Sequence, residues 1–259
     1  MASSSKSSKR VRCPRTSSTQ SRVFRADYDD EGVYFYQAYC DNIADHALLH
    51  GRLGGPSWGS SRMTWIKPSL AWMLYRSGYG RKPGQTRVLK IKLPHAAIAD
   101  ILRRCTLATA ASGRKRTTKS RSSDCEEEEL QECSASKMIT GRCWGSGSGR
   151  VQWDPERDLY ACEGREPRKL LHDRAIQIGV SGAVSEFYVK QISSIEEVTD
   201  LAHEMGEAHG QRAKKQKTET EVKEAVELLE RRGLLPAERE YVPQCEVDVL
   251  LRLGIGTHD

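Results

Sequence analysis

The sequence predicts an α+β fold: a single domain with a mixed, mostly antiparallel sheet flanked by helices. Segments with the two-residue alternation of strands and segments with the three-and-four spacing of helices follow one another irregularly, without a repeated βαβ unit. The glycine-rich motifs of dinucleotide-binding and P-loop folds, G-x-G-x-x-G and G-x-x-x-x-G-K-[ST], are absent. A chain of 259 residues is long enough to bury one sizeable core.

The first half of the chain carries the clearest element signals. Residues 33–39 are β-branched and aromatic, which is typical of a strand. Asp41 or Asn42 is suited to cap the next helix, and Gly51 to end it. Leu and Ile alternate with Lys90 and Lys92, which predicts a half-buried strand with one face in water. In chain order we expect a strand over 33–39, a helix over 42–51, a strand over 63–66, a helix over 68–78, a strand over 88–93 and a short helix from residue 94.

The second half begins with a segment that changes character. Residues 106–150 hold a basic run, an acidic run and a Gly/Ser-rich patch, which together predict a low-complexity insertion. Order is expected to resume at residue 151. The elements expected after it are a strand over 175–180, a helix that starts at 181–182 and contains residues 184–191, and an edge strand over 192–198. A mobile polar segment over 204–220, an amphipathic helix from about 222 that ends at Gly233, and a short helix around 247–253 follow.

The net charge of +6 belongs to the N-terminus. Residues 1–22 hold six of the 41 Lys and Arg and no acid, so the remaining 35 basic residues balance 35 acidic ones. We therefore expect a disordered, basic, Ser-rich tail over residues 1–21 and a single domain over 22–259, interrupted by the 106–150 insertion. Such a tail is able to contact nucleic acid through phosphates, but the body is not a basic nucleic-acid-binding domain.

Nothing in the sequence indicates a membrane partner or a metal. No run approaches 18 apolar residues, and the start of the chain lacks the apolar core of a secretory signal. The eight cysteines show no C-x-x-C pair and no paired metal spacing, so we expect reduced thiols and no metal site. These features predict a cytoplasmic or nuclear protein.

Residues 61–79 concentrate aromatic and cationic side chains between a strand and a helix. Pro68 suits the first turn of that helix and Gly78 the position just past its end. Arg62 and Lys67 lie near the expected helix start, where cations oppose the helix dipole unless an anion is bound. Arg76 lies in the last turn. The stretch predicts a site for a phosphate or a carboxylate and names no reaction.

Several other side chains have two interpretations. Trp65 and Trp72 are suited either to stack on a ligand or to pack in the core. Gln37 and Gln177 are suited either to line a cleft or to satisfy buried backbone groups. The histidines lack partners at any diagnostic spacing and receive no role.

Several segments resemble a family of bacterial and fungal proteins, domain of unknown function 4291. The run Arg-Met-Thr-Trp-Ile-Lys-Pro-Ser makes the match specific, and the matching pieces span about residue 22 to the C-terminus. They are 25–29, 36–39, 61–69, 72–73, 75–78, 153–158, 176–179, 181–182, 235–236 and 238–239. The insertion departs from the family pattern. Membership of this family implies no activity.

The order of elements is also similar, more distantly, to the first half of ADP-ribosyltransferase-like folds. That resemblance implies NAD as a cofactor, with Arg25 or Gln37 anchoring it and Tyr36, Tyr39 or Trp65 stacking on nicotinamide. Thr64 lies in the same run and joins the ligand-binding set. The late glutamate of those enzymes is missing, and Gln177 stands in the corresponding strand. An amide cannot supply the negative charge that stabilises a cationic reacting centre.

Three functions remain open. The first is a nucleotide-using transferase, with Gln177 and Gln37 as candidate catalytic residues. The second is a non-catalytic module that binds a nucleotide or another phosphorylated small molecule through the same cations. The third is a nucleic-acid-associated protein whose basic tail adds affinity.

Overall fold

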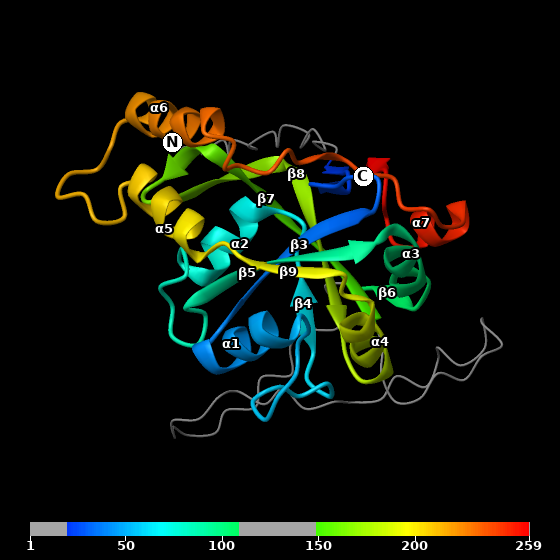
Figure 1. The fold of residues 1–259 in the computed structure, drawn as a ribbon. Helices are drawn as coiled ribbons and strands as arrows, with labels where there is room; N and C mark the ends of the chain where they lie inside the picture. The colour runs from blue at the N-terminus through cyan, green and yellow to red at the C-terminus, as the bar shows by residue number, and fades with distance from the viewer. Residues whose placement is uncertain (1–19, 109–148, 259) are drawn as a thin grey trace, which may run out of the picture.

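The computed structural model describes residues 20–108 and 149–258. Most of the predicted tail, and residues 109–148 of the predicted insertion, lie outside this part of the chain. Residues 106–107 and 149–150, which the sequence analysis placed in the insertion, lie in strands, because β6 (Cys105–Leu107) pairs in parallel with the start of β7 at Gly149. The described residues form the mixed, mostly antiparallel α+β fold that the sequence predicts (Figure 1).

A three-stranded antiparallel sheet crosses the middle of the molecule. It orders β3 (Gly32–Tyr39), β5 (Arg87–Pro94) and β9 (Ser194–Glu197) as β3-β5-β9, which confirms the strands predicted near 33–39, 88–93 and 192–198. The prediction of a wet lysine face on β5 is wrong. Lys92 is only 8% exposed, and Lys90 bonds Asp27 at 2.9 Å. The ammonium nitrogens of Lys90 and Lys92 lie 4.0 and 5.5 Å from the centre of the Tyr34 ring on β3.

The second sheet is built on one long hairpin. β7 (Gly149–Glu163) and β8 (Glu166–Val180) pair antiparallel, and the predicted strand over 175–180 is the last third of β8. β4 (Thr64–Ile66) pairs antiparallel with β8, while β1 (Ser21–Arg22) lies parallel to β8 and pairs antiparallel with β11 (Thr257–His258). A separate short pair joins β2 (Arg25–Ala26) and β10 (Arg239–Glu240).

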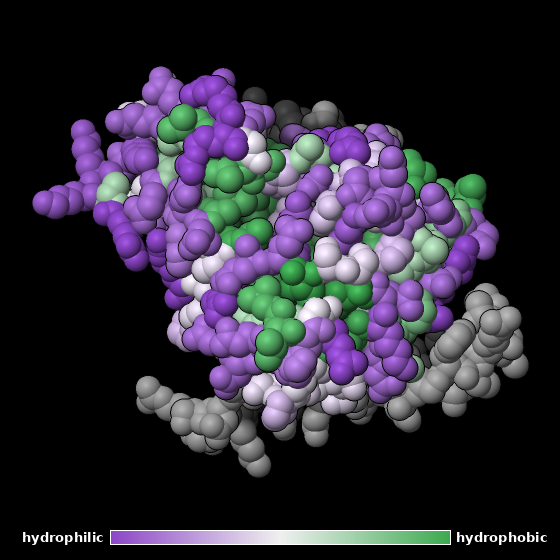
Figure 2. Space-filling view, in the orientation of Figure 1, coloured by the Kyte–Doolittle hydropathy of each residue, from purple (hydrophilic) through white to green (hydrophobic). Residues whose placement is uncertain are grey.

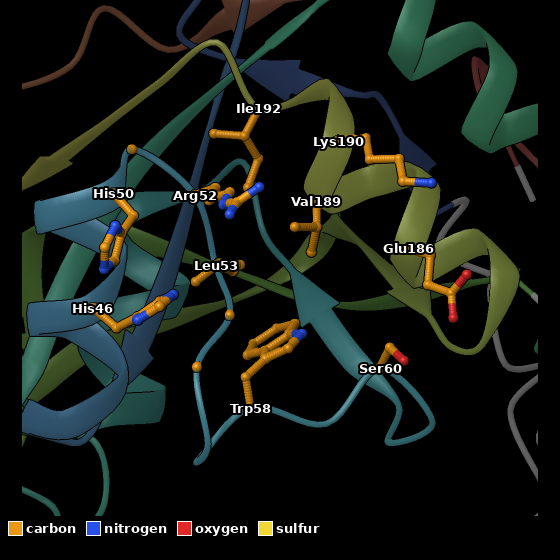
Figure 3. A pocket seen from close by; sticks show the side chains of 13 residues that line it. His46, His50, Arg52, Leu53, Trp58, Ser60, Glu186, Val189, Lys190 and Ile192 are labelled. Atoms are coloured by element: carbon orange, nitrogen blue, oxygen red, sulfur yellow. The ribbon is translucent and has the colours of Figure 1, made fainter.

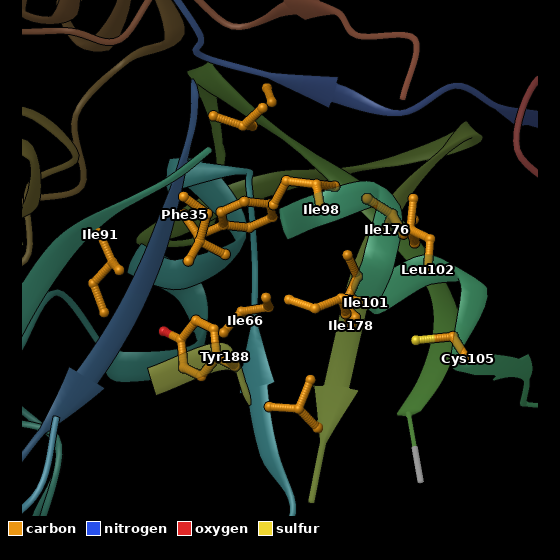
Figure 4. Packing of buried hydrophobic residues seen from close by; sticks show 14 of the residues in the cluster. Phe35, Ile66, Ile91, Ile98, Ile101, Leu102, Cys105, Ile176, Ile178 and Tyr188 are labelled. Carbon is orange, nitrogen blue, oxygen red and sulfur yellow. The ribbon is translucent and has the colours of Figure 1, made fainter. Parts of the chain in front are cut away.

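The main core lies between the two sheets. β3 contributes Val33 and Phe35, and β8 contributes alternate residues such as Ile176 and Ile178. Figure 4 shows Ile98 and Ile101 of α3 (His95–Arg103) pointing into the same space, with Tyr188 of α4 (Ala183–Gln191) beside them. Ile176, Ile178 and Val180 share this face, as the sequence predicts, so Gln177 lies on the opposite face of β8.

A second core covers the other face of the three-stranded sheet. Tyr36 and Val88 of that sheet pack with buried residues of α2 (Leu70–Ser77), α5 (Thr199–Ala208) and α6 (Glu219–Arg231). Leu70, Met73, Leu74 and Ser77 are all buried, which confirms the predicted face of α2. α1 (Asp41–His50) and α7 (Val247–Arg252) pack on the main core, α1 through Ala44 and Ala47 and α7 through Val249 (Figure 1).

Three helix predictions need correction. Residues 204–208, expected to be mobile, belong to α5, and His209 just after it is 1% exposed. Cys40, rather than Asp41 or Asn42, takes the N-cap position of α1. Pro68 precedes the N-cap of α2, which is Ser69. The predicted ends hold: Gly51 and Gly78 follow α1 and α2 with left-handed φ angles of 62° and 58°.

Candidate functional site

The strand-to-helix junction after β4 is held by backbone and side-chain bonds. The Tyr36 N–H donates to the Lys67 carbonyl at 2.7 Å, which fixes the chain as it leaves β4. Two residues later, the Ser69 side chain accepts from the Trp72 N–H at 3.3 Å and caps α2. Lys67 and Ser69 therefore have fixed positions at the start of the helix.

The anion expected at this helix start is supplied by the protein itself. The Glu238 carboxylate accepts from the Leu70 N–H at 2.7 Å, and the Ser69 hydroxyl donates to Glu156 at 2.9 Å. The two carboxylates therefore take up the Leu70 N–H and the Ser69 hydroxyl at the start of α2, which are groups that an external phosphate would use. The groups at the start of α2 are therefore already bonded within the protein, and the side chains around Lys67 are a separate environment.

The two carboxylates repel each other in a poorly solvated space. Burial raises the pKa of Glu238 to about 8, and the charge of Glu156 adds to that effect. Burial also raises the pKa of Glu156, against the bonds it accepts from the Arg157 N–H and from Ser69. Arg25 is exposed, and its charge lowers both pKa values. Predicted as an NAD anchor, Arg25 instead lies near the protein's own acids.

Lys67 is a cation without a direct anionic partner among the described residues. It is 5% exposed, and within residues 20–108 and 149–258 its ammonium group makes no ion pair or hydrogen bond. Its nitrogen lies 4.9 Å from the centre of the Trp72 ring, a cation–π contact. Burial and, to a smaller extent, the charge of Arg76 lower the pKa of Lys67 to about 7, against the opposing charge of Asp154.

Gln177 reaches the same region from β8. It pairs in register with Gln152 of β7, and both side-chain amides donate to Asp154, Gln152 at 2.9 Å. Burial raises the pKa of Asp154, while Gln152, Lys67 and Arg174 act in the other direction. We call Lys67, Trp72, Gln152, Asp154 and Gln177 the Lys67 cluster.

Gln37 belongs to a different environment. Its side-chain nitrogen donates to the Trp65 carbonyl at 3.2 Å, and its oxygen accepts from the Tyr188 hydroxyl at 2.6 Å. It alternates with Tyr36 along β3 and shares the face of Phe35, on the side of the main core. The structure therefore does not bring the two candidate catalytic amides, Gln37 and Gln177, into one site.

The remaining predicted residues are spread around β4. Tyr36 is 1% exposed in the second core, so its ring is not available for stacking. Trp65 is half-buried against Gly179, where an added Cβ would lie 3.0 Å from the indole ring. Thr64 is buried at 9% exposure. Tyr39 packs on Trp58 with ring centres 5.7 Å apart, and the exposed Arg62 lies near Tyr39. Arg76 is exposed and lies near Lys67.

A family model for a domain of unknown function (DUF4291) matches residues 23–241, most of the chain. The chain belongs to this family. No curated protein matches it.

The DUF4291 domain gathers distant segments at the Lys67 cluster and the carboxylate pair. Lys67 and Ser69 come from the 61–69 run, Asp154 and Glu156 from 153–158, and Gln177 from 176–179. The pair is completed by Glu238, from 238–239. All four segments are among those in which the sequence resembles the family. That resemblance was the one signal that singled out 153–158 and 238–239, and it assigned no role to the three acids.

No group of three or more His, Cys, Asp or Glu side chains is arranged to hold a metal ion in the part of the chain that the structure describes. None of the described helices has the length and apolar character needed to cross a membrane.

Proposed function

We propose that the DUF4291 domain binds a nucleotide or another phosphorylated small molecule at the Lys67 cluster. The observation that carries this proposal is the buried ammonium group of Lys67, which has no protein anion in direct contact among the described residues. Burying an unpaired charge lowers stability, and strongly shifted pKa values concentrate at functional sites. A bound phosphate supplies the missing anion and favours the charged form of Lys67.

The surroundings of Lys67 suit a phosphorylated ring compound. Arg76 is exposed one helical turn beyond Trp72 and offers a second positive charge without a burial cost. The Trp72 ring already contacts the ammonium group and is half-buried, so part of its surface is open to a ligand. Gln177 and Gln152 add amide groups that are suited to hydrogen bonding with ribose or base.

The finer proposal is an NAD-using, ADP-ribosyltransferase-like reaction, and Asp154 favours it. Gln177 lacks a charge, but its amide donates directly to Asp154. A carboxylate at this position supplies the negative charge that stabilises an oxocarbenium-like centre. In this proposal Gln177 orients Asp154 and the ribose, and Lys67 holds a phosphate. A non-catalytic nucleotide-binding module uses the same residues without the reaction.

Titration with NAD, ATP and a short RNA, followed by calorimetry and thermal unfolding, tests ligand binding. We expect NAD or ATP to bind the wild-type protein and Lys67→Met to weaken that binding at least about tenfold, which corresponds to about 1.4 kcal/mol. Without ligand, Lys67→Met is expected to be at least as stable as the wild type, because it removes a buried unpaired charge. Lys223→Met, the same substitution at a side chain that is 63% exposed on α6, is the matched control.

The outcomes separate the three functions. Nicotinamide release from NAD by the wild type, lost in Asp154→Asn with binding retained, supports the transferase. NAD binding without nicotinamide release over hours supports the non-catalytic module. Binding of RNA alone, unaffected by Lys67→Met, contradicts both. A loss of stability in Lys67→Met with unchanged ligand binding shows that Lys67 is structural.

A further inference from the structure

A cleft of about 650 Å³ lies between α1 and α4, and it shares no residue with the Lys67 cluster. Figure 3 shows α1 on one side, α4 on the other, and the loop that follows α1 crossing below them. Its volume falls in the range of small-molecule sites in proteins, roughly 300–1,000 Å³. The sequence analysis gave its histidines no role because they have no partner at a diagnostic spacing.

Two histidines form the α1 wall of this cleft. His46 and His50 lie one turn apart, and their ring centres are 4.3 Å apart. The loop backbone at Gly54 and Gly55 lies directly against His46, since an added Cβ at Gly55 would be 2.9 Å from its Nδ1. Gly55 also has a φ of 85°, which favours glycine. The loop therefore fits closely around the imidazole and fixes it.

Arg52 places a positive charge over the cleft. Gly51 ends α1 in the left-handed conformation and turns the chain, so that the next residue extends above Leu53 (Figure 3). The guanidinium group of Arg52 has no ion pair or hydrogen bond with any residue that the structure describes. Across the cleft, Lys190 and Glu186 of α4 stand at the rim, and Figure 3 shows Lys190 directed away from the cavity.

The floor of the cleft is apolar and aromatic. Trp58 points into the space between the helices, with Val189 and Leu53 close by (Figure 3). Tyr39 holds the Trp58 ring edge-on, with ring centres 5.7 Å apart. In Figure 2, hydrophobic surface is visible between α1 and α4 on this side of the molecule. A flat apolar surface therefore lies next to an unpaired guanidinium and two imidazoles.

We propose that the α1–α4 cleft is a second binding site, for a small planar ring that carries an anionic group. The ring stacks on Trp58, which provides a large flat surface at little entropic cost. The carboxylate or phosphate of the ligand pairs with Arg52, whose planar guanidinium accommodates two oxygens. The His46 and His50 rings add hydrogen-bond donors beside that anion. This proposal does not depend on the function of Lys67.

Calorimetric titration with two matched pairs of probes tests the ligand class. Nicotinate and adenosine 5′-monophosphate carry a ring with an anion, whereas nicotinamide and adenosine carry similar rings without one. We expect at least one anion to bind and its neutral partner to bind at least about tenfold more weakly. Whichever anion binds shows whether the cleft prefers a carboxylate or a phosphate on the ligand. Equal binding of anion and neutral partner, or binding of neither anion, overturns the proposal.

Variants then assign the binding to this cleft. Arg52→Gln and Trp58→Ala are each expected to lower the affinity for the anion at least about fivefold. Glu186→Gln at the rim is expected to leave that affinity within about twofold of the wild type. Lys67→Met is expected to leave it unchanged, which separates this site from the proposed function. Binding that is lost in Lys67→Met but kept in Arg52→Gln overturns the cleft proposal. Arg52 is exposed, so Arg52→Gln is expected to fold normally.

Discussion

Lys67 shows how a single residue is placed in an unfavourable position by its neighbours in sequence. It follows a strand that is fixed on β8, and its carbonyl is held by the Tyr36 N–H at 2.7 Å. Its side chain is therefore confined beside Trp72, where burial disfavours the charge. Because backbone contacts impose this position, the cost of the buried ammonium must be offset elsewhere in the fold or by a ligand.

The stability of the protein is expected to rise with pH because of Lys67. Its folded pKa, about 7, lies below its ordinary value of 10.5. Between these values the unfolded chain holds a proton that the folded chain has released, so raising the pH favours folding. Relative to Lys67→Met, wild-type stability should increase on the order of 2 kcal/mol from about pH 7 to about pH 9. Urea unfolding of both proteins across this range measures the difference. Parallel pH profiles would contradict the lowered pKa.

Glu238 is expected to have the opposite effect at lower pH. Its folded pKa, about 8, lies above its ordinary value of 4.5, so its contribution is complete below pH 4.5 and is lost as the pH rises through 8. Glu238→Gln keeps an oxygen for the Leu70 N–H and removes the repulsion from Glu156. The variant should therefore lose less stability than the wild type between about pH 5 and about pH 8. Urea midpoints across that range measure this. A steeper loss in the variant would show that the carboxylate is charged and stabilising.

At the residue scale, the sequence singled out cations around the start of α2 and gave no role to the acids that bond there. Lys67 stood out because a cation near a helix start opposes the local dipole. Glu238 and Glu156 reach the start of α2 only through folding, since they lie 168 and 87 positions beyond the residues they bond, Leu70 and Ser69. For Gln37 the sequence left two interpretations open, because its partners in the fold, the Trp65 carbonyl and the Tyr188 hydroxyl, lie 28 and 151 positions away. Such contacts are set by tertiary packing, which local patterns do not encode.

At the scale of elements, a buried row of hydrogen bonds joins the residues that follow α2 and α5 to β7. His209, after α5, bonds the Leu159 carbonyl of β7 through Nε2 at 2.7 Å, so that nitrogen carries the proton. Its Nδ1 then accepts from the Tyr79 hydroxyl, 2.6 Å away, just after α2. Tyr79 is fully buried and has a φ of 59°, an uncommon conformation for a tyrosine. These hydrogen bonds therefore hold the ends of α2 and α5 against the β7–β8 hairpin.

Removing one hydroxyl should disrupt this connection. Tyr79→Phe removes the hydroxyl that faces both the His209 Nδ1 at 2.6 Å and the Arg165 carbonyl at 3.1 Å, and it leaves the buried Nδ1 without a donor. We therefore expect a loss of about 1–2 kcal/mol in the free energy of unfolding. The ring and its packing remain, which separates the hydrogen bond from the hydrophobic contribution. Tyr28→Phe removes a hydroxyl that bonds a carbonyl at an exposed position, at 3.1 Å, and is the matched control with an expected loss near zero. Equal effects would mean that the buried row of hydrogen bonds adds no stability.

Helices and strands were predicted well where their buried face is large and apolar, as in α2, α3 and β3. α5 was missed because its buried residues other than Met205 are small or polar: Thr199, Ala202, Gly206 and Ala208. Gly206 lets the helix approach the Tyr79 side chain, whose Cβ lies 3.3 Å from where a glycine Cβ would be. The length of the β7–β8 hairpin was also missed, because its far half is mostly half-exposed and lacks a clean alternation.

At the scale of the whole molecule, the fold class followed from the order of elements, but the pairing of strands did not. Periodicity places residues on faces and says nothing about which strand lies beside which. The sequence therefore could not show that β4 joins β8, or that β1 and β6 add parallel pairs to a mostly antiparallel sheet. These pairings bring the family-like segments together at Lys67, so the full site appeared only in the folded chain.

The folded unit extends beyond the residues matched by the family model. That match ends at 241, but Leu253 is fully buried in the main core, and its carbonyl accepts from the Trp153 indole at 2.9 Å. Further along, the Gly256 N–H donates to the Arg22 carbonyl, which joins the C-terminal segment to β1. Residues 253–258 therefore add the edge strand β11 to the larger sheet and contribute Leu253 and Ile255 to the main core.

A protein that ends at residue 241 should consequently be unstable, and Leu253 tests the reason. Leu253→Ala leaves a cavity in the main core, so we expect a loss of about 2–4 kcal/mol in urea unfolding. Leu251→Ala, two positions earlier and 61% exposed, is the matched control with an expected change within about 0.5 kcal/mol. If both variants unfold at the same urea concentration as the wild type, the C-terminal segment does not contribute to the core. In that case a chain of residues 20–241 should fold on its own, and its cooperative unfolding would establish a smaller domain.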